Sequence, residues 1–326
     1  MVKFIRRLQK IGSSILVSLP KEWIIANNLD KGSQVELETG QDSVSISANK
    51  EMRPTKEVVI SYPLPKDENI VADITGAYLL GYDIIQITSK LIIPGENREQ
   101  IRNSMRRLVG MEIIEEDSSN INMQFLLDTT TLNPEKILKR ISSIALGMYD
   151  DIANGLISLD KSNLQTLAKR DVEVNRQYFL LVRLIRSTLV DKRLANIFNL
   201  ENIDILDYRM AANLLENAGD TIVELANYIY NSTLSQEHLK KIFDLVKNFN
   251  IIAEKSIDSF IKSDRRLAIE AISLHKKYQA NLLTLRSTIE NKKQIPTEIL
   301  DLLYMFERIA KSWADVADLV KPVYNK

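Results

Sequence analysis

The chain has 326 residues, and its 43 basic and 43 acidic side chains give a formal net charge of zero at neutral pH. It contains no cysteine, which excludes disulfides, zinc–thiolate sites and a cysteine nucleophile. The length predicts two or three domains. No apolar run reaches the length of a membrane span and no signal peptide comes before the first basic residues. We therefore expect a cytoplasmic protein without membrane insertion.

The beginning of the chain carries a local excess of positive charge. Its first 21 residues contain no acid and five cations, namely Lys3, Arg6, Arg7, Lys10 and Lys21. Across residues 1–50, seven Lys and Arg stand against five Asp and Glu, so the remainder of this neutral chain has a net charge of −2. A basic arm on a neutral body favours specific docking onto a nucleic acid over nonspecific coating.

Short elements are predicted through the same region. Two strands surround a Gly-Ser-Ser turn, and a short helix over Lys21–Asn27 has Pro20 at its first position. Asn28 suits a left-handed cap, and two alternating strands follow over Gln34–Glu38 and Ser43–Ser47. A module this small has too little core to stand alone, which predicts dimerisation.

This stretch resembles the swapped-hairpin DNA-binding domain of the AbrB, MazE and SpoVT families. The matching motifs, within about residues 3–48, are Gln9-Lys10-Ile11-Gly12-Ser13-Ser14, Ser18-Leu19-Pro20-Lys21 and Leu29-Asp30-Lys31-Gly32. The resemblance implies that two chains interleave their hairpins into one barrel, a homodimer that binds DNA at a palindromic operator. The expected DNA-binding residues are Lys3, Arg6, Arg7, Lys10, Gly12, Ser13, Ser14 and Lys21, most of them on phosphates and one arginine on a base edge. The alternative is a dimerisation barrel whose basic surface has no function.

A small α+β domain is predicted over residues 54–130, after a polar linker at Asn49–Pro54. Its predicted strands cover residues 58–62, 83–88, 111–116 and 121–127, and its predicted helices cover residues 67–80 and 97–109. The resulting βαβαββ order predicts helices on one face of a sheet. We find no phosphate loop or catalytic dyad in it, and we expect Arg106-Arg107 to form a solvated helix edge rather than an anion site. The role of this domain stays open.

From residue 131 to residue 326 the pattern is helical, and it repeats. Leu138, Ile141 and Ala145 correspond to Leu239, Ile242 and Val246, each pair 101 positions apart. Arg186-Ser187-Thr188-Leu189 likewise returns as Arg286-Ser287-Thr288-Ile289. Two copies of a three-helix unit are predicted, over residues 133–233 and 234–323.

The helical part resembles the PhoU family, whose fold is two tandem three-helix bundles. The residues that carry this resemblance are Arg170-Asp171-Val172-Glu173-Val174-Asn175-Arg176 and Asn213-Leu214-Leu215-Glu216-Asn217-Ala218-Gly219-Asp220. The chain is therefore expected to be multidomain: a small all-β swapped-hairpin barrel, a small α+β domain and an all-α PhoU-like pair of bundles. This combination resembles archaeal phosphate uptake regulators, which implies phosphate-transport or signalling proteins as partners.

Three carboxylates in the first repeat are candidate metal ligands. Asp171 falls in an otherwise apolar stripe, where a carboxylate is costly unless it is paired or binds metal. Glu216 and Asp220 share one face of the following helix, because successive residues turn by about 100°. Oxygen ligands suit divalent or iron-type metals, and the resemblance implies such clusters. The alternative is an exposed or ion-paired helix face.

The second repeat departs from the acidic motif. Asn175 already replaces the second carboxylate in repeat one, and the corresponding positions of repeat two are Ala271, His275, Glu307 and Lys311. We expect Lys311 to pair with Glu307 one turn before it, so any metal should bind repeat one only. Both histidines, His238 and His275, are expected at the surface.

Three functions follow from these patterns. The leading hypothesis is a dimeric transcription regulator linked to phosphate uptake, whose barrel contacts DNA and whose repeats sense an effector, metal or partner. The alternative is a PhoU-like interaction protein that regulates a phosphate transporter or its signalling without binding DNA. A metal-dependent phosphohydrolase is disfavoured, because no nucleophile or general base accompanies the carboxylates, so we do not expect an enzyme.

Overall fold

The computed structural model describes residues 3–40, 42–48, 55–65, 69–158, 161–290 and 297–322. The chain divides into two compact units, Met1–Pro54 (unit 1) and Thr55–Lys326 (unit 2). The predicted linker at Asn49–Pro54 and the predicted start of the first α+β helix at residue 67 lie outside the described residues.

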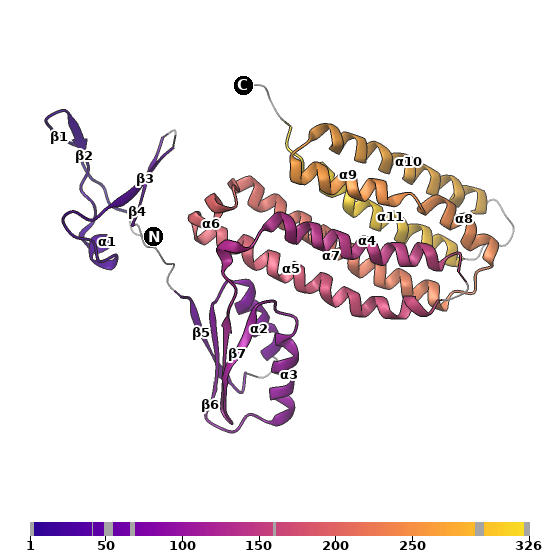
Figure 1. Cartoon of the computed structure of the whole chain (residues 1–326), viewed down its shortest axis with the longest axis horizontal. Helices are drawn as coiled ribbons and strands as arrows, with labels where there is room; N and C mark the ends of the chain where they lie inside the picture. The colour runs from indigo at the N-terminus through magenta and orange to yellow at the C-terminus, as the bar shows by residue number, and fades with distance from the viewer. Residues whose placement is uncertain are drawn as a thin grey trace. The chain divides into compact units, whose positions relative to one another are not determined.

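Unit 1 consists of two antiparallel hairpins and a short helix (Figure 1). Its elements are β1 (Gln9–Ile11), β2 (Ser14–Leu16), α1 (Lys21–Ala26), β3 (Val35–Thr39) and β4 (Val44–Ala48). Gly12 has a φ of 63° in the turn between β1 and β2, and Asn28 has a φ of 51°, the left-handed conformation that the sequence predicts. Pro20 is the N-cap of α1 rather than its first residue.

The first part of unit 2 is a four-stranded sheet with two helices on one face (Figure 1). Its elements follow the predicted βαβαββ order: β5 (Glu57–Tyr62), α2 (Ile70–Leu79), β6 (Ile84–Ser89), α3 (Gly95–Met105), β7 (Met111–Glu116) and β8 (Asn120–Phe125). The strand order is β5-β6-β8-β7, with β5 parallel to β6 and the other pairs antiparallel. Strands β5 and β7 are therefore the two edges.

The remainder of unit 2 is helical. After η1 (Thr129–Thr131) come α4 (Pro134–Gly155), η2 (Ser162–Thr166), α5 (Leu167–Val190), α6 (Lys192–Ile197), α7 (Asn202–Asn231), α8 (Gln236–Val246), α9 (Phe249–Lys262), α10 (Arg265–Glu290) and α11 (Thr297–Asp318). Helices α4, α5 and α7 contact one another, α9, α10 and α11 do the same, and α7 packs against α11. Each predicted repeat thus contributes three mutually packed helices.

The helical part has two capped helix starts and one break in a helix that the repeat pattern does not contain. Asn133 accepts a hydrogen bond from Lys136 N at 2.9 Å and Ser235 accepts one from His238 N at 3.4 Å, so these two side chains cap α4 and α8. The helix that should begin repeat two is divided at Lys247–Asn248 into α8 and α9, whereas its counterpart α4 is continuous. The two repeats therefore share the positions of their apolar residues, but they differ in whether the first helix is continuous.

A buried arginine joins the sheet to the helices of unit 2. Arg183 on α5 is 3% exposed, and its Nη1 donates to the carbonyl oxygens of Tyr78 and Tyr82, both at 2.8 Å. Its Nη2 donates to Asp83 Oδ1 at 3.1 Å, and its guanidinium carbon lies 3.9 Å from the centre of the Phe125 ring. The predicted boundary between residues 130 and 131 lies within this one compact unit.

Among the helices that the structure describes, none combines the length and apolar composition that crossing a membrane requires.

Candidate functional site

The predicted DNA-binding residues all belong to unit 1. All eight of them are exposed: Lys3, Arg6, Arg7, Lys10, Gly12, Ser13, Ser14 and Lys21. Arg6 and Arg7 come before β1, which begins at Gln9. Lys10 is within β1, paired with Ile15 of β2. The basic arm (residues 3–21) thus presents its cations on an exposed segment, on a hairpin and at the first residue of α1.

No described residue of unit 1 is buried within the single chain. In the β3–β4 hairpin, alternation places Val35 and Leu37 on the same face as Val44 and Ile46, and Leu37 and Val44 are 60% and 61% exposed. Ile11 and Ile15 of the other hairpin are 63% and 67% exposed. These apolar side chains lack the burial that stabilises a folded domain.

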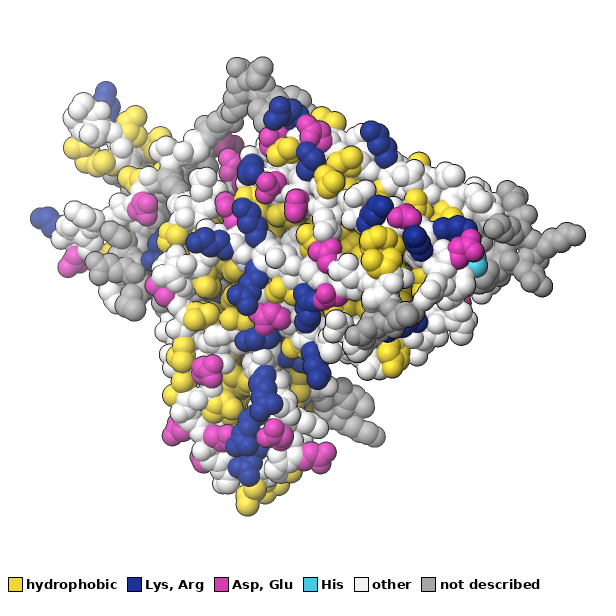
Figure 2. Space-filling view, turned by 45° about the vertical axis from the view of Figure 1, so that its right-hand side comes forward, with side chains coloured by type: hydrophobic (Ala, Val, Ile, Leu, Met, Phe, Trp, Pro, Cys, Tyr) yellow, Lys and Arg dark blue, Asp and Glu magenta, His cyan; other side chains and the backbone are white. Residues whose placement is uncertain are grey.

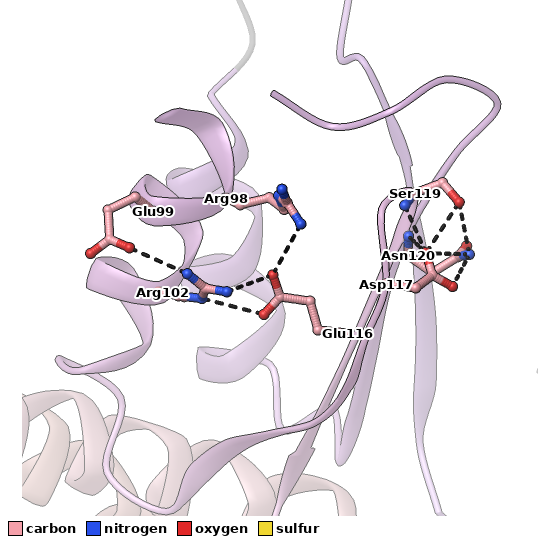
Figure 3. A network of polar contacts seen from close by, with 7 residues as sticks. All are labelled: Arg98, Glu99, Arg102, Glu116, Asp117, Ser119 and Asn120. Atoms are coloured by element: carbon pink, nitrogen blue, oxygen red, sulfur yellow. Dashed lines mark hydrogen bonds and ion pairs between the residues drawn. The ribbon is translucent and has the colours of Figure 1, made fainter. Parts of the chain in front are cut away.

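Two basic side chains of the α+β part, Arg98 and Arg102, are paired with acids. Figure 2 shows Lys and Arg side chains in a vertical band that runs from the middle of the view to its lower end, with Asp and Glu beside them. In α3, Arg102 donates to Glu116 at 2.9 Å and also contacts Glu99, while Arg98 lies 3.8 Å from Glu116 (Figure 3). Arg106 and Arg107 are exposed, as a solvated helix edge requires.

The acidic cluster (Asp171, Glu216 and Asp220) lies between α5 and α7. Asp171 Oδ1 is buried without a hydrogen-bond partner, and Asp171 Oδ2 accepts from Asn175 Nδ2 at 2.8 Å. A Cβ on Gly219 would lie 2.9 Å from Asp171 Oδ1, so the absence of a side chain there lets the carboxylate approach α7.

Burial and mutual repulsion oppose the negative charges of this cluster. Burial, followed by the charge of Asp220, raises the pKa of Asp171 to about 6. Burial, followed by the charges of Asp220 and Asp171, also raises the pKa of Glu216. The charge of Asp220 is therefore near enough to both Asp171 and Glu216 to oppose their ionisation.

The cluster offers some of the features of a metal site. A cation at Asp171 Oδ1 would satisfy the buried oxygen and reduce the repulsion, and hard divalent ions prefer such ligands. In the described part of the chain, however, no three His, Asp or Glu side chains converge closely enough to hold a metal ion. Asn175, which replaces a carboxylate of the motif, donates to Asp171 instead of adding a ligand.

The corresponding face of repeat two has different contacts. Ala271 is buried, and Glu307 accepts from Gln279 at 3.0 Å. The predicted Glu307–Lys311 pair is wrong: Lys311 lies 3.7 Å from Asp315, the acid one turn in the other direction. His275 is half-buried with an unpartnered Nε2, and His238 is half-buried as well, so neither histidine is as exposed as expected.

Comparison with known families finds two matches, one in unit 1 and one in the first half of the helical part. A family model described as antidote-toxin recognition MazE, bacterial antitoxin, matches residues 8–47. The PhoU domain model matches residues 138–229. The predicted resemblances to the MazE and PhoU families are thus confirmed.

The segment that matches the PhoU model runs from α4 to α7 and contains the acidic cluster, while α8 to α11 lie beyond the matched residues. Two solved PhoU structures are similar to this chain. The phosphate transport system regulatory protein PhoU from Streptococcus pneumoniae is 17% identical, with a TM-score of 0.47, over 57% of this chain and 91% of that one. PhoU from Pseudomonas aeruginosa is 16% identical, with a TM-score of 0.41, over 57% and 93%. No curated protein sequence matches the chain.

Proposed function

We propose that this chain is a dimeric, DNA-binding transcription regulator linked to phosphate uptake. The observation that carries the proposal is the basic arm, whose five cations are exposed and whose first 21 residues contain no acid. Lys and Arg side chains on DNA phosphates release counterions, which supplies much of the affinity of such proteins. The MazE-like match over residues 8–47 supports a regulatory role for the same segment.

Dimerisation follows from the exposed apolar face of unit 1. Two copies that interleave their hairpins would bury Leu37, Val44 and their neighbours, which a single chain leaves open. The dimer would also double the basic arm and present two copies to a palindromic operator. Two arms could then make about 6–8 phosphate contacts, so affinity should fall steeply with salt.

Binding of the Arg6→Ala, Arg7→Ala and Lys10→Ala variants to DNA from upstream of the gene tests the proposal. Loss of a phosphate contact should weaken all sequences equally and reduce the salt slope by about one, while loss of the base-reading arginine should erode discrimination by about 1–3 kcal/mol. Lys31→Ala is the matched control, because Lys31 is an exposed cation outside the arm. If all three arm variants bind as the parent does, the basic arm has no role in DNA binding.

We further propose that the PhoU domain responds to an effector at the acidic cluster, with a divalent or iron-type metal as the candidate. Asp171, Glu216 and Asp220 would hold it after moving closer together than they lie in the described structure, and the unpartnered Asp171 Oδ1 supports this choice. Metal analysis of the purified protein should show loss for Asp171→Ala and none for Glu307→Ala. Equal loss from both variants would contradict a site confined to repeat one.

A second candidate is a regulator that acts on a phosphate transporter or its signalling through protein contacts alone. The arm itself favours it in one respect, because Ile5 and Leu8 are 94% and 72% exposed between the cations. Apolar and basic residues together also suit a protein partner. Under this alternative, the alanine variants of the arm would leave DNA binding unchanged, and Ile5→Ser and Leu8→Ser would reduce capture of the partner.

A further inference from the structure

The two edges of the sheet in unit 2 differ in how they are protected from pairing. Strand β7 has a bulge between Ile113 and Glu115, and it carries Glu112, Glu115 and Glu116. Bulges and charged side chains are the usual protection of an edge strand against pairing with another chain. Strand β5, with the sequence EVVISY, is regular and has one charge, Glu57, at its beginning. The β5 edge is therefore open to a further strand.

The direction of the free backbone groups follows from the pairing of β5 with β6. Ile84 N donates to Lys56 O at 3.0 Å, so the N–H and C=O groups of even-numbered residues point toward β6. Those of Glu57, Val59 and Ser61 point away from the sheet, because the direction alternates along a strand. Within the described chain, β5 pairs with β6 alone.

The side chains of Glu57, Val59 and Ser61 are exposed as well. Ile60 is 8% exposed and faces the core, whereas Glu57, Val59 and Ser61 are exposed on the other face, Val59 to 57%. Val59 is thus an apolar residue at the middle of an open edge, with no charge beside it on the strand. This arrangement suits pairing with a strand of similar composition.

We infer that β5 pairs antiparallel with β5 of a second copy of this chain, so that two sheets join into one across a two-fold axis at Val59. The hydrogen-bonded pairs are Val59 with Val59 of the second copy, and Glu57 with Ser61 of the second copy in both directions. This register places no like charges opposite each other, and it buries the two valines against one another.

The position of β5 in the sequence favours a second copy over a strand of another protein. Residues 49–54 are all that separates Ala48, at the end of β4, from Thr55. Dimerisation of unit 1 would therefore hold two β5 strands at a high effective concentration. This step rests on the dimer of the proposed function, whereas the open edge and its register do not.

Disulfide trapping in the full chain tests the register, because the parent contains no cysteine. In the proposed pairing the two Cα atoms of Val59 lie about 5.5 Å apart, within the range of a disulfide. Mild oxidation should link Val59→Cys into a dimer at least about tenfold faster than Ile114→Cys, a matched exposed residue on the β7 edge. Ser61→Cys alone should stay unlinked, because its two copies lie roughly 14 Å apart.

A mixed experiment gives a second test of the register. Glu57→Cys and Ser61→Cys, co-expressed, should form the mixed disulfide, and adding Val59→Lys to both chains should abolish it by placing two lysines face to face. Sedimentation of the parent reports the dimer of unit 1 independently. A dimeric parent whose Val59→Cys variant links no faster than Ile114→Cys would overturn the β5 pairing and leave the proposed function standing. If the parent is monomeric but its Val59→Cys variant links selectively at high protein concentration, the β5 pairing is supported and the proposed dimer of unit 1 is contradicted.

Discussion

At the scale of single residues, Asp171 is a carboxylate whose surroundings oppose its charge. Its folded-state pKa of about 6 lies above the ordinary value of 3.8, so the folded protein binds more protons than the unfolded chain between these pH values. Stability is therefore lost as the pH rises from about 4 to about 6, and the deficit persists above that range. Asp171→Asn should raise the melting temperature at pH 7, with the gain disappearing near pH 4.

Thermal denaturation in the presence of a chelator measures this effect without any bound metal. Asn175→Ala provides a matched variant, because the Asn175 amide donates to Asp171 Oδ2 and lowers the pKa of that carboxyl. Loss of this amide should raise the pKa of Asp171 further, so stability should continue to fall up to a higher pH. A gain from Asp171→Asn that is the same at pH 4 and pH 7 would show that the charge is not responsible.

Arg183 presents the opposite case, a buried charge with several partners. Arg183→Met would leave the carbonyl oxygens of Tyr78 and Tyr82 without this donor and would remove the ion pair to Asp83. We expect it to lower the free energy of unfolding of unit 2 by about 3 kcal/mol, since breaking a buried pair leaves its partners uncompensated.

Arg140→Met is the control for this variant. The Arg140–Glu173 pair is 2.9 Å long, but the arginine side chain is 60% exposed, so its loss should cost less than about 1 kcal/mol. Denaturant titrations of both variants measure the difference. Equal losses would mean that the burial of Arg183 contributes nothing to joining the sheet and the helices.

At the scale of elements, Ser263 ends α9 in a left-handed conformation with a φ of 50°. A serine is strained there, whereas glycine adopts this conformation freely. Ser263→Gly should raise the free energy of unfolding by about 0.5–1 kcal/mol. Ser273→Gly, at an exposed position inside α10, should lower it by about 0.5 kcal/mol. Stabilisation by both variants, or by neither, would contradict a cap-specific effect.

Local signals were sufficient to predict the element order of the α+β part, because glycine and cap residues mark its boundaries. Gly81 and Gly110 both have a φ of 79°, a conformation that stops a helix, and each follows a predicted helix. The strand order and the division between α8 and α9 depend on packing between distant segments, which a local pattern does not contain. The Glu307–Lys311 prediction failed for a related reason: Asp315 lies at the same spacing on the other side of Lys311.

The candidate sites were predictable to different degrees. Asp171 was predicted from its place in an apolar stripe, and the structure brings it near Asp220 and Glu216. The buried contacts of Arg183 had no signal in the sequence, because a single arginine in a helix is ordinarily exposed. The open edge of β5 likewise emerges only when the strand order is known.

At the scale of the whole molecule, the stability of unit 1 should depend on protein concentration, since no described residue of this unit is buried in one chain. The β3–β4 hairpin allows a matched test, because Leu37 and Ser45 lie on its opposite faces. Leu37→Lys would place a charge on the apolar face, whereas Ser45→Lys would place the same charge on the polar face, opposite Glu38 in the register.

We expect Leu37→Lys to reduce the dimer to weak, concentration-dependent association and to lower DNA affinity about 100-fold or more, because one chain then contacts DNA without its partner. Ser45→Lys should remain dimeric and bind DNA at least as well as the parent. Sedimentation and DNA titration at one salt concentration measure both effects. Circular dichroism should show that the helices of unit 2 are unchanged, since they have their own core. A Leu37→Lys variant that stays dimeric would show that unit 1 does not hold the two chains together.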